Sequence, residues 1–474
     1  MDPTLQQLLD RLPEREAARR LAERLRREHP AEYQRIKRTP ALFANLLTLA
    51  AYSPWLGDAM LAQPEIIAYL TRKGAANRSR TRDELDEELG RFAARRTGDD
   101  KQSLLAAFKQ RELARIYLRD CLGLATLTET TEELSNLADC ILSHALAHVR
   151  QTLVNRHGAP QTTDARGRVA DAEFAIVGLG KLGSRELNYA SDIDLMFLFD
   201  GDGHTSSPAN GTGPIDNRAF FTKLAEEVFR TVGSPGRTAP VYRVDLRLRP
   251  YGQDGELVVR LERAVEYYRD RAQNWERQML IRARCSAGSE RLVHRLLDDL
   301  RAVIFRAETL PESIAGVRAA RDKIDRKEKA RGGGFNVKLG PGGIREIEFV
   351  AQALQMIRGG RDARLRGRPT IPMLGILAES GLLARPAVDE LAAAYDVLRR
   401  VEHRLQYAED QQTHLLPRGE AARELLAGSM GHASWEAFKG ALDDHRATVR
   451  RHFEGVLGDA GVNDAAGSGT GGGE

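Results

Sequence analysis

The chain has 474 residues, of which 42% are hydrophobic, and its 71 Lys and Arg against 67 Asp and Glu leave a formal net charge of +4. This length predicts roughly two to four domains, and so small a charge excess gives no indication of a nucleic-acid-binding face. The three cysteines fit neither a zinc-binding spacing nor a disulfide framework, which favours a reducing, cytoplasmic compartment. The N-terminus has no apolar signal core, and no stretch reaches the roughly 18 apolar residues of a membrane span, so we expect neither.

The first part of the chain, residues 1–155, is predicted to be a helical domain. Residues 43–70 carry apolar side chains at helical spacing, interrupted by Pro54 and Pro64. Residues 108–124 place Leu113, Ile116 and Leu122 on one side of a helix and charged residues on the other, the pattern of a surface helix with a solvated polar face.

The pattern changes after residue 156, where a polar, turn-rich stretch marks a plausible domain boundary. Three short apolar runs follow, and each is typical of a strand: residues 174–180, 192–199 and 242–249. Between them, residues 217–232 predict a helix with Phe221, Leu224 and Val228 on its buried side. We therefore predict an α/β core over residues 156–300.

Helical patterns return in the last part of the chain. Residues 260–285 predict one long amphipathic helix, and residues 390–410 predict another. We expect a C-terminal helical bundle over residues 301–457 and a disordered, Gly-rich tail over 458–474. The fold class is α+β and mostly helical, with the α/β core flanked by the two helical domains.

The motif GLGKLGS, residues 178–184, follows directly after the first predicted strand. Its glycines let the backbone turn tightly and approach a phosphate, and Gly183 and Ser184 are the predicted nucleotide-phosphate contacts. A G-x-G-x-x-G run also occurs in dinucleotide-binding folds, but by itself it is weak evidence. Here the next strand begins within eight residues of Ser184, which suits a short helix and a metal site better than a nicotinamide site.

The next strand carries the candidate metal ligands. Side chains alternate along a strand, so Asp192 and Asp194 share one face, roughly 6 to 7 Å apart, and the apolar residues between and after them face a core. Two neighbouring carboxylates repel each other unless a cation lies between them, and Mg²⁺ favours such oxygen ligands together with substrate phosphates. The alternative is an Asp pair that caps a helix or ends a turn.

The third strand adds Asp245, which by alternation shares a face with Arg243, Arg247 and Arg249. One interpretation is an ion-pair ladder. The other is a third metal ligand, with Arg247 among the arginines that hold phosphate oxygens. Two metals about 3.5 to 4 Å apart would then brace the entering and leaving groups of an in-line displacement.

Three weaker features keep alternative interpretations. The Gly-rich stretch around Lys338 and Arg345 either folds over the site, with Lys338 contacting phosphate, or is a turn-rich connection with structural ion pairs. Trp275 is expected to pack in a core, beside a solvated basic helix face. His144 and His148 share a helix face but lack the glutamate and third ligand of a zinc motif, so a zinc site there is not expected.

At these residues the chain resembles the DNA polymerase beta-like nucleotidyltransferase superfamily. Within it, the resemblance is to the glutamine synthetase adenylyltransferase/adenylyl-removing enzyme family, over about residues 40–455. Four segments carry it, in this order: GLGKLGSRELNYASDIDLMF, RVDLRLRPYGQDGELV, NWERQMLIRAR and VKLGPGGIREIEFVAQALQ. Arg345 before Glu346 resembles the N-terminal, adenylyl-removing half, whereas Gly183-Ser184 departs slightly from the Gly-Gly of many members.

The resemblance implies phosphorolysis: orthophosphate removes AMP from a tyrosine of glutamine synthetase, and ADP leaves. It further implies Mg²⁺, or Mn²⁺, on Asp192, Asp194 and Asp245, with ADP or ATP and phosphate as substrates or products. Glutamine synthetase and a PII signal protein are the implied partners. Two alternatives stay open, namely ATP-dependent adenylylation and a non-catalytic module that binds glutamine synthetase or PII. A template-using polymerase fits the composition less well.

Overall fold

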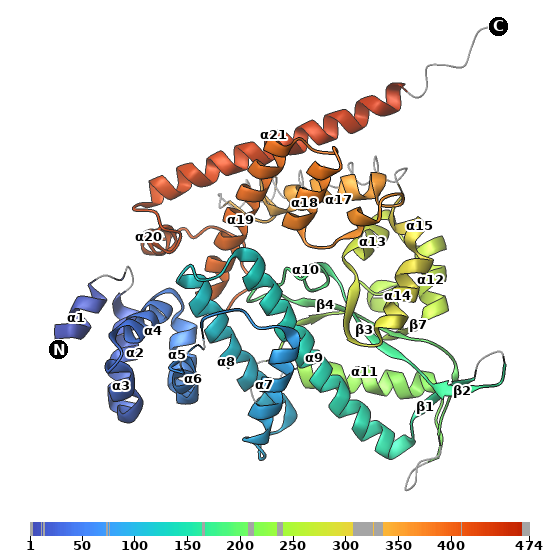
Figure 1. The fold of residues 1–474 in the computed structure, drawn as a ribbon, viewed down its shortest axis with the longest axis horizontal. Coiled ribbons are helices and arrows are strands. Elements are labelled where there is room, and N and C mark those ends of the chain that lie inside the picture. The colour runs from blue at the N-terminus through green and yellow to red at the C-terminus, as the bar shows by residue number, and fades with distance from the viewer. Residues whose placement is uncertain are drawn as a thin grey trace. The chain divides into compact units, whose positions relative to one another are not determined.

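The computed structural model describes residues 3–10, 12, 15–72, 74, 76–163, 166–206, 213–234, 240–306, 326, 335–408 and 410–466. Its elements are mainly helices, with two small sheets (Figure 1). Within the described residues, no helix combines the length and apolar character needed to cross a membrane. The α+β, mostly helical fold class is confirmed.

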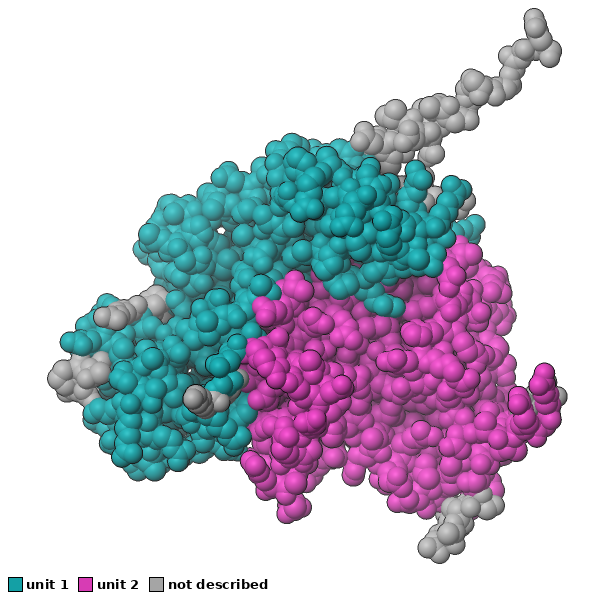
Figure 2. Space-filling model, viewed as in Figure 1, with its two compact units in different colours: residues 1–77, 117–127, 305–474 teal, residues 78–116, 128–304 magenta. Residues whose placement is uncertain are grey.

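The chain forms two compact units (Figure 2). Unit 1 comprises residues 1–77, 117–127 and 305–474, and unit 2 comprises residues 78–116 and 128–304. Helix α8, Lys101–Cys121, begins in unit 2 and ends in unit 1. The domain boundaries expected at residues 155, 300 and 457 stay predictions.

Unit 1 is helical. Its first part contains α1 (Pro3–Leu9), α2 (Arg15–Glu28), α3 (Pro30–Lys37), α4 (Pro40–Tyr52), α5 (Pro54–Ala62) and α6 (Pro64–Leu70). Its second part contains α17 (Ile344–Arg358), α18 (Thr370–Glu379), α19 (Arg385–Tyr407), α20 (Glu420–Ser429) and α21 (Trp435–Ala466). The predicted breaks at Pro54 and Pro64 are confirmed, because each proline opens a helix, where its missing N–H costs no hydrogen bond.

Unit 2 holds a five-stranded sheet. Four of its strands follow the order β6-β4-β3-β8, and the fifth strand, β7, also pairs with β4. The strands are β3 (Phe174–Gly178), β4 (Ile193–Phe199), β6 (Val244–Asp245), β7 (Val258–Arg260) and β8 (Arg284–Gly288). β3 and β4 are antiparallel, whereas β6 and β7 both run parallel to β4. A second, three-stranded sheet consists of β1 (Pro160–Thr163), β2 (Val169–Asp171) and β5 (Gly203–Thr205).

Helices surround this sheet in unit 2. They are α7 (Arg82–Ala94), α9 (Leu127–His157), α10 (Gly180–Gly183), α11 (Asn217–Gly233), α12 (Leu261–Asp270), α13 (Asn274–Met279), α14 (Glu290–Asp299) and α15 (Arg301–Ile304), with short 3-10 turns at Gly252–Asp254 and Leu280–Arg282. The predicted α11 is confirmed, and Phe221, Leu224 and Val228 are buried. Phe221 stacks on Phe174, at 5.4 Å between ring centroids, and so joins α11 to the sheet.

Two predicted elements are wrong in extent. Residues 260–285 are not one helix, because α12 ends at Asp270 and a capping box formed by Gln273 and Glu276 starts α13. The strand predicted over 242–249 is only Val244–Asp245. The Asp245 carboxylate accepts the backbone N–H of Arg247 at 2.8 Å, an Asx turn that takes the chain out of the extended conformation.

One further expectation differs from the structure. The helix over 108–124 exists as α8, but its charged residues Glu112, Arg115 and Asp120 are buried and paired, not solvated. The last helix, α21, spans Trp435–Ala466. Residues 467–474 of the predicted tail, and Gly332–Gly334 of the Gly-rich stretch, lie outside the described residues.

Candidate active site

Strand β4 positions the first two candidate ligands. All its residues are fully buried except Asp194, so the strand is buried on both faces and opens to solvent only at its beginning. Asp192 immediately precedes the strand and has a side chain 32% exposed. The apolar residues expected in the core, Ile193, Leu195, Phe197 and Phe199, are all buried.

Strand β6 brings the third candidate ligand to the same place. It runs parallel to β4, with Ile193 opposite Val244 and Asp194 opposite Asp245. Neighbouring strands lie about 4.7–4.9 Å apart, so the two aspartates are cross-strand neighbours. Residues more than 50 positions apart in the sequence therefore meet at one edge of the sheet.

The glycine turn between β3 and β4 lies against Asp194. Gly180 has a φ of +54°, and a Cβ built on it would come within 2.2 Å of Asp194 Oδ2. Only glycine accepts that backbone conformation without strain and also leaves the carboxylate its space. The glycine turn therefore lies in close contact with the strand that carries Asp194. A site that binds both a phosphate and a metal ion requires such a contact.

Gly183 and Ser184 are packed inside the protein. A Cβ on Gly183 would lie 2.1 Å from the carbonyl oxygen of Arg282. Ser184 is buried, and its hydroxyl donates to the carbonyl oxygens of Gly180 and Lys181 at 3.2 and 3.3 Å. In this structure both residues shape the turn, so their contact with nucleotide phosphate stays a prediction.

Arg284 of β8 fixes the turn from behind. Its guanidinium donates to the carbonyl oxygen of Leu182 at 2.9 and 3.2 Å, and it pairs with Asp139 of α9 at 2.6 and 3.1 Å. Arg284 is buried, so the solvated basic face expected for this segment is wrong at this residue. Trp275, expected in a core, is instead 53% exposed, and its ring N–H donates to Gln273 Oε1 at 2.8 Å.

The arginines near the aspartates have different roles. Arg243 donates to Asp192 Oδ1 at 2.7 Å, and Arg247 forms a two-pronged pair with Asp245. Arg249 instead donates to backbone carbonyls, among them those of Leu246 and Gly255. Of the ion-pair ladder that was the alternative interpretation, only the pair of Asp245 with Arg247 forms, because the chain turns after Asp245.

Electrostatics link the three carboxylates through Arg247. Its hydrogen bond and charge pairing with Asp245 raise its pKa, and the charges of Asp194 and Asp192 raise it further. The Arg247 hydrogen bonds in turn lower the pKa of Asp245 and keep it ionised. The three aspartates thus face two arginines, Arg243 and Arg247, and their oxygens do not gather as closely as the ligands of a bound ion do.

Lys338 belongs to unit 1, where its segment is held by local contacts. The Asn336 side chain accepts the backbone N–H groups of Lys338 and Leu339 at 3.0 and 2.9 Å. Gly342 follows with a φ of +72°, and a Cβ there would lie 2.2 Å from the carbonyl oxygen of Arg446. These contacts describe a turn packed on α21, and the proposed phosphate contact of Lys338 stays a prediction.

The sequence analysis missed two residues of this site. The glycines of the motif, Gly180 among them, were considered only because they let the backbone approach a phosphate. The close contact of Gly180 with Asp194 depends on how β4 packs against the turn. Arg243 was placed beside Asp245, but it pairs with Asp192. Only the three-dimensional structure shows that a side chain at position 180 would collide with Asp194, so no sequence signal distinguishes Gly180 from its neighbours.

A glycine turn fitted to an Asp-x-Asp strand, with a further aspartate on the adjacent strand, defines the class as nucleotidyltransferase. The model of one family, described as glutamate-ammonia ligase adenylyltransferase, matches residues 43–298. The chain belongs to this family. A second model, described as GlnD PII-uridylyltransferase, matches residues 318–457.

Relatives in several bacteria carry the name bifunctional glutamine synthetase adenylyltransferase/adenylyl-removing enzyme. The Thioalkalivibrio sulfidiphilus protein is 42% identical over 78% of this chain and 38% of its own length. The Aromatoleum aromaticum protein is 40% identical over 79% of this chain and 39% of its own length. The Pseudomonas aeruginosa protein is 34% identical over 87% of this chain and 41% of its own length. The chain thus spans about two fifths of these relatives.

Proposed function

We propose that this chain removes AMP from an adenylylated tyrosine of glutamine synthetase by phosphorolysis. An oxygen of orthophosphate attacks the AMP phosphorus, the bond from phosphorus to the tyrosine oxygen breaks, and ADP leaves. The tyrosine oxygen takes up a proton and regains its hydroxyl. The observation that best supports a site for phosphoryl transfer is the strand register that places Asp194 opposite Asp245 and beside Gly180.

The donor chemistry of the site fits Mg²⁺, with Mn²⁺ as an alternative. Asp192, Asp194 and Asp245 offer only carboxylate oxygens, the ligands that Mg²⁺ prefers, and two of them are cross-strand neighbours. These aspartates would hold the ion. When bound, it would neutralise negative charge on the phosphate oxygens during transfer.

The chain's own residues would orient the reacting groups. Arg247 is exposed and already neutralises Asp245, so it is available to exchange this carboxylate for a phosphate oxygen once a cation takes over the aspartate. Gly180 keeps the turn close to Asp194. Gly183, Ser184 and Lys338 are further proposed nucleotide contacts, on the resemblance of their motifs alone.

The direction of transfer is proposed from two sources. The relatives' printed name contains both an adenylyltransferase and an adenylyl-removing activity, and Arg345 before Glu346 resembles the removing half. A PII signal protein is the proposed regulatory partner, because the model matched over residues 318–457 is described as a PII-uridylyltransferase.

The test is incubation of the purified chain with adenylylated glutamine synthetase, Mg²⁺ and phosphate. We expect release of ADP, and incorporation of AMP from ATP into unmodified glutamine synthetase would instead assign the forward reaction. Asp192→Asn and Asp194→Asn should each lower turnover by about 10²–10³-fold or more, the usual cost of losing one group that stabilises transition-state charge.

Asp202→Asn is the matched control. Asp202 follows β4 at its other end, is exposed, and pairs with Arg260 away from the three aspartates. Its substitution should leave turnover unchanged. Unaltered turnover in both the Asp192 and Asp194 variants would reject the proposed site, and a complex with glutamine synthetase that forms without turnover would favour a binding module.

A further inference from the structure

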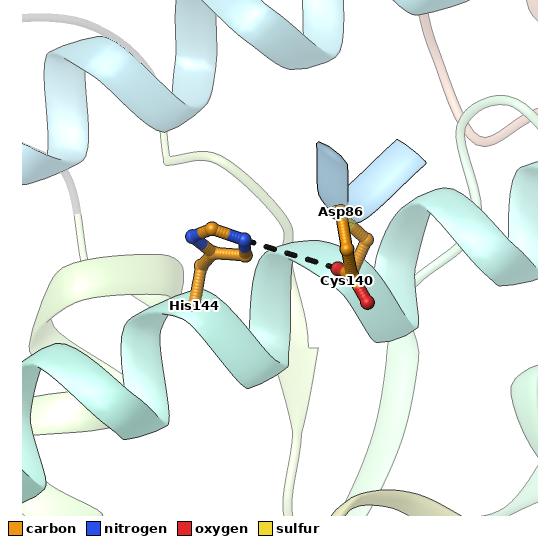
Figure 3. A group of neighbouring side chains, drawn as sticks. All are labelled: Asp86, Cys140 and His144. Carbon is orange, nitrogen blue, oxygen red and sulfur yellow. Dashed lines mark ion pairs between the residues drawn. The ribbon is translucent and has the colours of Figure 1, made fainter. Parts of the chain in front are cut away.

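Helices α7 and α9 bring three potential metal ligands together in unit 2. Figure 3 shows Cys140 and His144 on one helix and Asp86 on another, with the His144 ring turned toward Asp86. One ligand atom from each residue lies within 4.8 Å of the other two. Cys140 and His144 are four residues apart on α9 and so share a helix face.

One atom of this group has no hydrogen-bond partner. Asp86 Oδ1 is buried and accepts no hydrogen bond, and it lies 3.9 Å from His144 Nε2, too far for such a bond. A buried carboxylate oxygen without a partner is costly, unless a cation or an ordered water satisfies it. The other oxygen, Oδ2, lies 3.6 Å from Arg82. Asp86 Oδ1 is thus an unsatisfied acceptor close to His144.

The donor groups suit a divalent cation. Burial lowers the pKa of His144, which leaves the imidazole neutral with a lone pair available. Burial, and then a side-chain hydrogen bond to Asp86, raise the pKa of the Cys140 thiol, so the thiol keeps its proton until a cation displaces it. The side chains of His144 and Asp86 are 30% and 34% exposed, which gives an ion a route from solvent.

We propose that Asp86, Cys140 and His144 form a zinc site. A sulfur, a nitrogen and an oxygen donor match the ligands of Zn²⁺, and three protein ligands leave a fourth, tetrahedral position for water. Bonds of about 2.0–2.1 Å to nitrogen and oxygen place these atoms about 3.3 Å apart in a tetrahedral site. The observed 3.9 Å needs only a small closure. On binding, the thiol proton passes to solvent and the site becomes neutral.

A metal ion at this site would stabilise the contacts that hold the glycine turn of the nucleotidyltransferase site. Asp139, next to Cys140 on α9, pairs with Arg284, and Arg284 holds the carbonyl oxygen of Leu182 in the glycine turn. A metal that ties α7 to α9 would therefore stiffen the helix from which this chain of contacts begins. The role is structural, separate from the proposed ion at the three aspartates.

The test is metal binding to the full chain after chelator treatment and dialysis. We expect one Zn²⁺ per chain by titration calorimetry, a higher melting temperature with zinc than without, and a thiolate-to-metal absorption band with Co²⁺. His144→Ala should weaken zinc binding by more than about 100-fold, because losing a ligand costs more than losing a group that merely orients one.

His148→Ala is the matched control. His148 lies one helical turn further along α9 and is exposed, so its loss should leave zinc affinity unchanged. Cys140→Ser should abolish the cobalt band, whereas Cys285→Ser should keep it. Asp192→Asn should also keep it, which separates this site from the active site. Equal affinities of the two histidine variants, or no zinc bound by the wild-type chain, would overturn the proposal.

Discussion

Two groups of carboxylates in this protein have opposite environments. On α8, Glu112 is fully buried and is met by Arg115 at 2.9 Å and by Arg111 at 2.8 Å. At the edge of the sheet, Asp192 and Asp245 reach solvent and each pairs with a single exposed arginine. The buried carboxylate is thus paired with buried arginines, whereas the aspartates at the sheet edge pair with solvent-exposed ones.

This difference distinguishes a buried ion-pair network from the aspartates that we propose hold a metal ion. Burial opposes the ionised form of Glu112, but Arg115, Arg111 and Arg80 outweigh it and lower its pKa. Such a network can be lost only by unfolding or by leaving a charge uncompensated. Arg243 and Arg247 pair with Asp192 and Asp245 at the edge of the sheet, where we propose that a metal ion and a phosphate replace these contacts. The density of acidic and basic residues alone would not distinguish the two groups.

The largest effect should come from removing the central arginine of the buried group. Arg115 is fully buried and also pairs with Glu133, so Arg115→Met would leave two buried carboxylates without it. We expect a loss of about 3–5 kcal/mol in the free energy of unfolding, measured by denaturant titration. Arg230→Met, which breaks an exposed pair with Glu227 on α11, should cost less than about 1 kcal/mol. Similar losses in both variants would remove the distinction drawn above.

An intermediate effect should follow Gly180→Ala, which adds a Cβ where Asp194 Oδ2 lies. The positive φ should cost about 1–2 kcal/mol of stability. The displaced carboxylate should lower turnover by about 10²-fold, the usual result of a displacement near 1 Å at a reacting centre. The control is Gly167→Ala, which has a φ of +75° and no atom near the added Cβ. It should lose the same stability and keep its turnover, and equal activity in both variants would contradict the role of Gly180.

The smallest effect concerns the stability of the folded protein in acid. It depends on a second group of buried ionisable side chains, around Asp120. Burial lowers the pKa of His403 below its ordinary 6.5, so the folded state holds it neutral while the unfolded state takes up a proton. Stability should therefore fall as the pH drops below 6.5, by at most about 1.4 kcal/mol per pH unit for this proton.

The Asp120 carboxyl adds to this loss at lower pH. Burial opposes its charge, but the charge of Arg404 and the hydrogen bonds from His403 and Tyr407 outweigh burial and lower its pKa below 3.8, so its contribution is lost only on further acidification. His403→Gln should flatten the first part of the denaturation profile, between pH 6.5 and 5, and leave the part below 3.8. An unchanged profile would show that His403 is protonated in the folded state.

The sequence by itself determined the class of fold and supplied the candidate residues of the site. The alternation in residues 192–199, the short interval after Ser184 and the helix of residues 217–232 are local patterns, and the structure confirms β4 and α11. Local hydrogen bonds and side-chain periodicity act over a few residues, so a single segment contains the information that specifies them.

Only the tertiary structure decided which residues meet. The pairing of Asp194 with Asp245, the fit of Gly180 to that aspartate, and the burial of Glu112 and Arg115 each depend on segments far apart in the chain. The strand expected over 242–249 ended at Asp245 because its own carboxylate bonded the backbone of Arg247. A charged side chain has the same sequence signature on a solvated face and in a buried pair, since its environment is made by the residues that fold against it.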